Sequence, residues 1–243
     1  MKAMVLAAGE GSRLGALTED KPKPMLAVGG VPILERNVRL LARYGVEEIV
    51  INLHHRPEVI VDHFGDGSRF GVKITYSFEE RLLGTAGALG KVRDIFRDDF
   101  FLVYGDNLTT CDLGALMRLH HERAAALTIA LYYREDPRAS GIVGLDAEDR
   151  IVRFVEKPLP DQIFSHWVNA GYLALAPSVL DLIPVSGASD FGHDIFGKLL
   201  REGARVYGYR MTEKLWWIDS RVDYERTCRE FLELDSSQGQ GKG

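Results

Sequence analysis

The fold class of this chain is indicated by the stretch KAMVLAAGEGSRLG, residues 2–15. It begins with a short apolar run, Lys2–Ala7, of the kind that forms a buried strand. A glycine-rich segment follows at once, and glycines in that position let backbone N–H groups close around phosphate oxygens. Because ligands of open α/β sheets bind at the carboxyl ends of the strands, this loop is the first candidate for a binding site.

The loop differs from two well-known phosphate-binding motifs. Leu14 occupies the position of the third glycine of the dinucleotide fingerprint, and the Gly-Lys-Ser/Thr ending of a P-loop is missing. Pro22 and Pro24 exclude the long helix that follows a Rossmann loop. The cations of this segment are Arg13, Lys21 and Lys23. Clustered cations in a long loop favour the binding of an anion over a purely structural role.

Apolar and amphipathic stretches alternate through the first half of the chain. Buried strands are predicted at Lys2–Ala7, Glu48–Leu53, Phe100–Tyr104 and Leu127–Tyr133. Helices are predicted at Ile33–Tyr44 and Leu113–Ala124, where apolar residues recur at helical spacing. This alternation predicts an α/β fold with a mostly parallel central sheet flanked by helices.

The second half of the chain changes character. Two strands, Ile142–Leu145 and Ile151–Val155, flank a polar turn and predict a hairpin, which would form a small antiparallel insertion. The other predicted elements are a strand at Val168–Leu175, helices at Ser178–Ile183 and Phe191–Glu202, a strand at Val206–Met211 and a helix at Val222–Leu234. We expect a single domain over residues 1–235 and a disordered Gly/Gln/Ser tail over residues 236–243.

Charge and composition exclude several classes of protein. The chain has 30 Lys and Arg against 35 Asp and Glu, a net charge of −5, so it lacks the basic surface of a general nucleic-acid binder. Cys111 and Cys228 are too few for a disulfide framework. The longest apolar run, residues 124–133, is too short to cross a membrane, and the N-terminus lacks a secretory signal. We therefore expect a cytoplasmic protein.

Several motifs together resemble the sugar-1-phosphate nucleotidyltransferases. The pattern Gly-x-Gly-x-Arg-Leu at residues 9–14 is followed by Lys-Pro-Lys-Pro-Met at 21–25. Further matching stretches occur in the expected order at residues 83–89, 104–107, 155–158 and 169–172. The resemblance implies a Rossmann-like nucleotidyltransferase fold, similar to the glycosyltransferase-A fold. It also implies the reaction of an NTP with a sugar 1-phosphate to give an NDP-sugar and pyrophosphate.

The resemblance further implies a role for individual residues. Catalysis is assigned to Arg13 and Lys23. Nucleotide binding is assigned to Leu6, Ala8, Gly9, Gly11, Gly84 and Thr85. Sugar-phosphate binding is assigned to Asp106, Glu156, Lys157, Asn169 and Gly171. Binding of the cofactor Mg²⁺ is assigned to Asp106 and Asp219. The alternative for the segment near the C-terminus is that Asp219 or Ser220 caps the final helix.

The implied chemistry depends on cations rather than on a nucleophilic side chain. The attacking group is a phosphate oxygen, which is largely ionised near neutral pH because the second phosphate pKa is about 6. Negative charge builds around the α-phosphorus, and Arg13, Lys23 and Lys157 with Mg²⁺ form a set that can stabilise it. Lys157 precedes Pro158, so it is expected in an extended segment from which it can reach a phosphate.

The substrates are indicated by residues 189–196, Ser-Asp-Phe-Gly-His-Asp-Ile-Phe. Together with the 83–89 motif they most resemble the mannose-1-phosphate guanylyltransferases, so GTP and a mannose- or heptose-type 1-phosphate are expected. The alternative is uridylyl-, thymidylyl- or cytidylyltransfer to another sugar phosphate or to phosphocholine. A further alternative is a non-catalytic sugar-nucleotide-binding regulatory subunit. The expected partners are the two substrates, and neither nucleic acid nor a membrane is expected. Whether the protein forms a homo-oligomer is left open.

Overall fold

Four parallel strands form the centre of the fold. The computed structural model describes residues 1–239, and the side chains of residues 1–233. The four strands are β1 (Lys2–Leu6), β4 (Glu48–Leu53), β5 (Lys73–Phe78) and β6 (Phe100–Tyr104). Strand β1 lies between β4 and β6, and β5 pairs with β4. Leu6 is in register with Asn52 on one side and Tyr104 on the other, so the segments after these strands meet at one edge of the sheet.

The second half of the chain extends this sheet with strands of both directions. These strands are β8 (Leu127–Tyr133), β9 (Gly141–Leu145), β10 (Ile151–Glu156), β11 (Trp167–Leu175) and β12 (Val206–Arg210). Strand β11 runs antiparallel to β6, β8 and β9, and β9 with β10 forms the predicted hairpin. The nine-stranded sheet has the order β10-β9-β11-β6-β1-β4-β5, with β8 beside β11 and β12 beside β8.

Two short sheets stand apart from the main one. One pairs β2 (Ala27–Val28) with β3 (Val31–Pro32), and the other pairs β7 (Leu108–Thr109) with β13 (Leu215–Trp216). The pairing of β7 with β13 matters for the site. It places the residues that follow β13, from 217 onward, beside the segment that follows β6.

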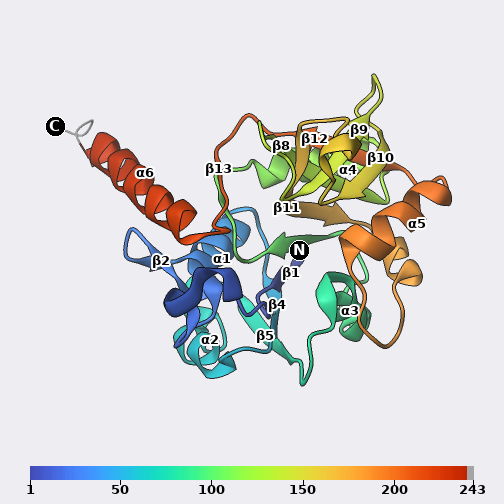
Figure 1. The fold of residues 1–243 in the computed structure, drawn as a ribbon. Helices are drawn as coiled ribbons and strands as arrows, with labels where there is room; N and C mark the ends of the chain where they lie inside the picture. Colours follow the sequence, from blue (N-terminus) through green and yellow to red (C-terminus); the bar gives the residue numbers. More distant parts are fainter. Residues whose placement is uncertain (240–243) are drawn as a thin grey trace.

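Helices pack against both faces of the sheet. They are α1 (Ile33–Arg43), α2 (Pro57–Phe64), α3 (Gly84–Lys91), α4 (Leu113–Glu122), α5 (Phe196–Arg201) and α6 (Arg221–Gly239). Successive strand residues point to opposite faces. Ala3 and Val5 therefore pack in one hydrophobic cluster with α1, α2 and α4, whereas Met4 packs in another with α3 and α5. Helix α6 extends away from the sheet (Figure 1).

Short helical turns occupy several loops. The 3-10 turns are η1 (Ser12–Thr18), η2 (Lys23–Met25), η3 (Ser68–Phe70), η4 (Arg93–Ile95), η5 (Pro160–Gln162) and η6 (Pro177–Leu182). A π-helical turn, η7 (Phe191–Ile195), leads into α5. The loop after β1 thus contains only short turns, as its two prolines predict.

The predicted fold class is confirmed, with a mostly parallel centre and antiparallel strands in the second half. The strand β5 and the helices α2 and α3 were not predicted. Helix α6 continues to Gly239, so residues 236–239 of the predicted tail are helical, while residues 240–243 lie outside the described residues. The single-domain organisation stays a prediction. Every helix of residues 1–239 is too short or too polar to span a membrane, and the expected cytoplasmic location stays a prediction.

Candidate active site

The glycine-rich loop after β1 folds over Lys23. Gly11 has a φ of +66°, and a Cβ at this position would lie 2.8 Å from the Cβ of Lys23, so only glycine allows this close approach. Within residues 1–239, the backbone N–H groups of Ala8 and Gly9 donate to no protein acceptor. Both residues line a cavity, so these N–H groups are available to the phosphate oxygens that the sequence predicts there.

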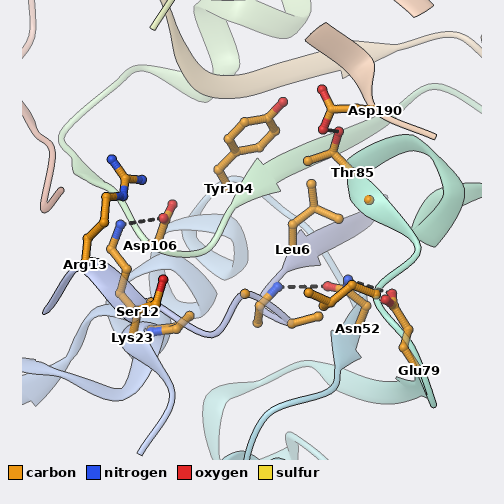
Figure 2. A pocket seen from close by; sticks show the side chains of 17 residues that line it. Leu6, Ser12, Arg13, Lys23, Asn52, Glu79, Thr85, Tyr104, Asp106 and Asp190 are labelled. Carbon is orange, nitrogen blue, oxygen red and sulfur yellow. Dashed lines mark hydrogen bonds and ion pairs between the residues drawn. The ribbon is translucent and has the colours of Figure 1, made fainter. Parts of the chain in front are cut away.

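Lys23 is buried, with 7% of its side chain exposed, and two carboxylates hold its ammonium group. Its Nζ donates to Asp106 Oδ2 at 2.6 Å and lies 3.9 Å from Asp219 Oδ1. Arg13 reaches the same oxygen of Asp219 at 3.6 Å from a mostly exposed position. Figure 2 shows Lys23 joined to Asp106, with the side chain of Arg13 beside them. The fold therefore brings together four residues that the sequence separates widely.

Asp219 reaches this cluster because β13 pairs with β7. Trp216 lies opposite Leu108, which places the following segment close to Asp106. The alternative role of Asp219 as a helix cap is not observed. Ser220 takes that role, since its hydroxyl accepts from the N–H of Asp223 at 3.2 Å. The carboxylate of Asp219 is thus left to face the two cations.

The first cavity, of about 350 Å³, opens at the carboxyl ends of the central strands (Figure 2). Its lining includes every residue predicted to bind the nucleotide: Leu6, Ala8, Gly9, Gly11, Gly84 and Thr85. Gly84 has a φ of +72°, and a Cβ there would lie 2.4 Å from the carbonyl oxygen of Ser189. The start of α3 therefore packs directly on the backbone that precedes η7, and this contact closes one wall of the cavity.

A polar pair in the first cavity was missed by the sequence analysis. Asn52, in β4, accepts from the N–H of Ala7 at 2.8 Å and donates to Glu79 Oε1 at 2.9 Å. The other oxygen of Glu79 accepts from the N–H of Leu83 at 2.9 Å. Glu79 is only 6% exposed, so the fold fixes a carboxylate beside the loop at residues 82–85. A polar residue near the carboxyl end of a parallel strand is the signal that could have identified Asn52.

The second cavity is lined by most of the residues predicted to bind the sugar phosphate: Asp106, Glu156, Lys157 and Asn169. Lys157 has a φ of +46°, so the expectation of an extended backbone there is wrong. Its N–H donates to the carbonyl of Ser140 at 3.2 Å, and this bond helps to hold the unusual conformation. The cavity also contains Arg134 and Trp217, which the sequence analysis did not select.

Gly171 lines neither cavity. Its N–H donates to Asn169 Oδ1 at 2.9 Å, and a Cβ at Gly171 would lie 3.0 Å from Cβ of Tyr104 and from Nδ2 of Asn107. Its φ is +82°, and it lies within β11 where the pairing with β8 is irregular, between Asn169 and Leu173. This close packing against Tyr104 and Asn107 explains why glycine is needed here, and the contact of Gly171 with the sugar phosphate stays a prediction.

The two cavities share a wall. The shared residues are Arg13, Thr85, Tyr104, Asp106 and Asp190. Asp190, which was not predicted, accepts from Thr85 Oγ1 at 2.9 Å and from the N–H of Gly192 at 2.8 Å. Burial raises the pKa of Tyr104 well above its usual value, so its hydroxyl stays neutral. A ligand in one cavity would therefore meet a ligand in the other at this wall.

Glu156 carries a partly buried carboxylate in the second cavity. A Cβ on Gly141 or on Gly192 would lie 2.6 Å from Oε2 of Glu156, so glycines on both sides make room for it. Burial raises the pKa of Glu156, and nearby Asp190 raises it further, while Lys157 lowers it. Within the described part of the chain this carboxylate accepts no protein hydrogen bond, which leaves its oxygens available to a ligand.

We expect Glu156→Gln to raise the melting temperature at pH 7. Because the pKa of Glu156 is raised on folding, the charged carboxyl destabilises the folded state once the pH exceeds the unfolded-state value. The gain should therefore shrink as the pH falls toward the ordinary pKa of glutamate and vanish below it, where the carboxyl is protonated in both states. Thermal unfolding of both proteins between pH 4.5 and 8 would measure this. Equal melting temperatures at pH 7 would contradict the expectation.

The residues present fit a magnesium site completed by substrate. Among the described residues, no group of three or more His, Cys, Asp or Glu side chains is placed to hold a metal ion. Asp106 and Asp219, however, are both near the same ammonium group of Lys23, so two carboxylates converge on one point. Mg²⁺ is usually bound by one or two carboxylates together with substrate phosphates. The pair therefore has the donor chemistry that Mg²⁺ requires.

Comparison with known proteins places the chain in one family. The family model described as nucleotidyl transferase matches residues 2–220, which is most of the chain. The chain therefore belongs to the nucleotidyl transferase family. Its named relatives are sugar-1-phosphate nucleotidyltransferases, which confirms the resemblance found in the sequence.

Two curated relatives have different names. The chain is 36% identical over 248 residues to UTP–glucose-1-phosphate uridylyltransferase of Synechocystis sp., covering 96% of this chain and 63% of that protein. It is 38% identical over 222 residues to mannose-1-phosphate guanylyltransferase of Mycobacterium tuberculosis, covering 89% of this chain and 60% of that protein. The chain thus spans less than two thirds of the length of these relatives. A solved Bacillus anthracis structure, of a protein assigned as a glucose-1-phosphate thymidylyltransferase, matches with a TM-score of 0.86 and 25% identity over 95% of both chains.

Proposed function

We propose that the protein transfers a nucleotidyl group from an NTP to a sugar 1-phosphate. The observation that carries this proposal is the shared wall of the two cavities, where Arg13 and Asp106 face both. A phosphate oxygen of the sugar 1-phosphate would attack the α-phosphorus of the NTP. The bond from the α-phosphorus to its bridging oxygen breaks, and pyrophosphate leaves with that electron pair.

The chain's own residues supply donors and positive charge for this step. The nucleophile needs no general base, because it is already an ionised phosphate oxygen. Arg13 lies at the shared wall, and Lys23 lines the first cavity and donates to Asp106 of that wall. The free N–H groups of Ala8 and Gly9 lie on the same loop as Arg13. Preorganised donors of this kind stabilise charge that develops in the transition state. The leaving pyrophosphate would be held by this loop.

We propose Mg²⁺ as the cofactor. Asp106 and Asp219 would hold it together with phosphate oxygens of the substrates. When bound, it supplies a Lewis acid that neutralises phosphate charge. Lys23 already balances the two carboxylates, which explains how they remain close together in the protein.

We propose guanine as the preferred base because of Glu79. A carboxylate is only an acceptor of hydrogen bonds, and the ring N–H and the exocyclic amino group of guanine are adjacent donors on one edge. Uracil and thymine offer a single N–H that lies between two carbonyl oxygens. The negative oxygens of a carboxylate repel these two carbonyl oxygens. Each oxygen of Glu79 accepts one bond from the protein and can accept another, and Glu79 lines the first cavity.

We propose a mannose-type sugar on the resemblance of residues 189–196 and on the second cavity. Glu156 and Asn169 line this cavity and offer acceptors and a donor for sugar hydroxyls. The segment 189–196 contributes Asp190 to the same wall. A heptose 1-phosphate carries similar ring hydroxyls, so it belongs in the same panel of substrates.

A pyrophosphate-release assay tests the proposed function. We expect release with GTP and mannose 1-phosphate in the presence of Mg²⁺, and slower release with ATP, CTP, UTP or dTTP and with glucose 1-phosphate. Faster turnover of UTP with glucose 1-phosphate would overturn the choice of base and sugar but not the reaction. Nucleotide binding without release of pyrophosphate from any pair would overturn the reaction and favour a non-catalytic subunit.

We expect Glu79→Gln to lower kcat/KM for GTP by about 10- to 100-fold, the range for a lost charge-assisted hydrogen bond. The same change should raise kcat/KM for UTP, because an amide removes the repulsion and supplies a donor. Glu80→Gln is the matched control, since Glu80 is exposed, does not line the first cavity and undergoes the same chemical change. An unchanged ratio of GTP to UTP activity in Glu79→Gln would show that the base lies elsewhere.

A further inference from the structure

Arg134 lies at the second cavity, immediately after β8. Both backbone polar groups of Arg134, its N–H and its carbonyl, form hydrogen bonds with His166. The N–H of Arg134 donates to the carbonyl of His166 at 3.0 Å, and the carbonyl of Arg134 accepts from Nδ1 of His166 at 2.9 Å. The point from which the side chain starts is therefore well defined.

The guanidinium group of Arg134 is held over an aromatic ring. Its Cζ lies 4.2 Å from the centre of the Trp217 ring, and its NH1 donates to Ser140 Oγ at 3.0 Å. Stacking on an indole orients the planar guanidinium and leaves the donors on its rim available. Within the described residues, the bond to Ser140 is the only hydrogen bond that this side chain makes. Its remaining N–H groups can therefore bind a ligand.

Arg134 and Lys157 each lie near a carboxylate without forming an ion pair with it: Arg134 helps to lower the pKa of Asp136, and Lys157 lowers that of Glu156. Among residues 1–233, no Asp or Glu oxygen lies within ion-pair distance of Arg134 or of Lys157. Glu135 and Asp136 follow Arg134 directly in the chain. Neither forms an ion pair with it, and Asp136 is occupied by Arg138, whose Nε and NH2 donate to its two oxygens at 2.8 and 2.7 Å. Arg13 and Lys23, in contrast, already pair with Asp219 and Asp106.

Ser140 connects the two unpaired cations. Its carbonyl accepts from the N–H of Lys157, and its hydroxyl accepts from Arg134. The same residue thus orders the backbone that presents the lysine and the guanidinium of the arginine. Two cations on one cavity wall, each with free donors, match a phosphate dianion with several acceptor oxygens.

We propose that Arg134 binds the phosphate of the sugar 1-phosphate together with Lys157, and that Trp217 and Ser140 are positioning residues for Arg134. This inference rests on the proposed function, because it takes the second cavity as the sugar-phosphate site. It adds to that function a residue outside every motif that carries the family resemblance. Trp217 affects phosphate binding by orienting the guanidinium group of Arg134, and not by contacting the phosphate itself.

Steady-state kinetics with each substrate varied in turn tests the proposal. Arg134→Ala should raise KM for mannose 1-phosphate by about 10- to 100-fold and leave KM for GTP within about twofold, since the contact exists in the ground state. Arg134→Lys should recover only part of the loss, because lysine lacks the planar, stacked fork. Trp217→Leu should raise the KM for mannose 1-phosphate by a smaller factor than Arg134→Ala does. Arg97→Ala, at an exposed residue before β6 that lines neither cavity, should leave both KM values unchanged.

Binding calorimetry separates this inference from the proposed function. With an active wild-type enzyme, an unchanged KM for mannose 1-phosphate in Arg134→Ala and in Arg134→Gln overturns the inference alone. If the wild type turns over no pair of substrates, the proposed function fails, and titration with inorganic phosphate decides the anion site. Weaker binding of phosphate to Arg134→Ala than to Arg97→Ala supports the site, and equal binding overturns it. Melting temperatures of all variants confirm that the compared proteins are folded.

Discussion

Asp106→Asn should lower kcat by about 10³-fold at ordinary Mg²⁺ concentrations, because a hard cation needs the negative charge that asparagine lacks. Asp106 faces both cavities and lies 2.6 Å from Lys23, so it is central to the proposed site. The folded state should lose little stability, since Asp219 remains 3.9 Å from the ammonium group of Lys23. Turnover measured over a range of Mg²⁺ concentrations, with melting temperatures alongside, checks both expectations.

The matched control for this prediction is Asp98→Asn. Asp98 is exposed and precedes β6, so it lies at the opposite edge of the sheet and undergoes the same chemical change. EDTA should abolish the activity of the wild type and of the control, and added Mg²⁺ should restore it. Wild-type turnover by Asp106→Asn, with EDTA still inhibiting, would place the metal at other residues.

Lys23→Ala should lower kcat by about 10²- to 10³-fold, the range for the loss of one preorganised donor to developing charge. Charge on the leaving pyrophosphate develops only as the bond to the α-phosphorus breaks, so the loss should appear in kcat more than in KM. Lys23→Ala should also destabilise the protein, because Asp106 and Asp219 then face each other without the buried cation between them. Kinetics and thermal unfolding of the same preparation measure the two effects.

Lys157→Ala provides the contrasting variant. Lys157 lines the second cavity and not the first, so its loss should chiefly raise KM for the sugar 1-phosphate and leave KM for the nucleotide unchanged. Its side chain is exposed and its removal should not lower the melting temperature. The same kinetic pattern in Lys23→Ala and Lys157→Ala would contradict two separate phosphate sites.

The parts of the fold that could be predicted have local signals. Strands β4 and β6 were predicted at their observed bounds, because each is a short apolar run that ends at polar or glycine residues. Helix α3 was missed, since its glycines interrupt the apolar pattern and Gly84 begins it at a positive φ. It forms because its small residues pack closely on the backbone near Ser189, which is a contact between distant parts of the chain.

The candidate site shows the same division. The motifs identified Lys23, Asp106 and Asp219 as site residues, but nothing local indicates that one ammonium group lies between the two carboxylates. Asn52 was missed because a single polar residue in an apolar strand has no pattern of its own. Its partner Glu79 comes from the segment after β5, a strand that was itself not predicted.

The sequence by itself determined the alternation of strands and helices, the glycine-rich loop and the family motifs, because each depends on residues that are neighbours in the chain. The tertiary structure alone decided which cations are already paired and which are free to bind a ligand. Arg134 shows the physical reason: its role depends on Trp217 stacking beneath it and on Arg138 occupying Asp136. Coulomb and hydrogen-bond energies depend on distances of a few ångströms between side chains, and for residues so far apart in the chain the fold sets those distances.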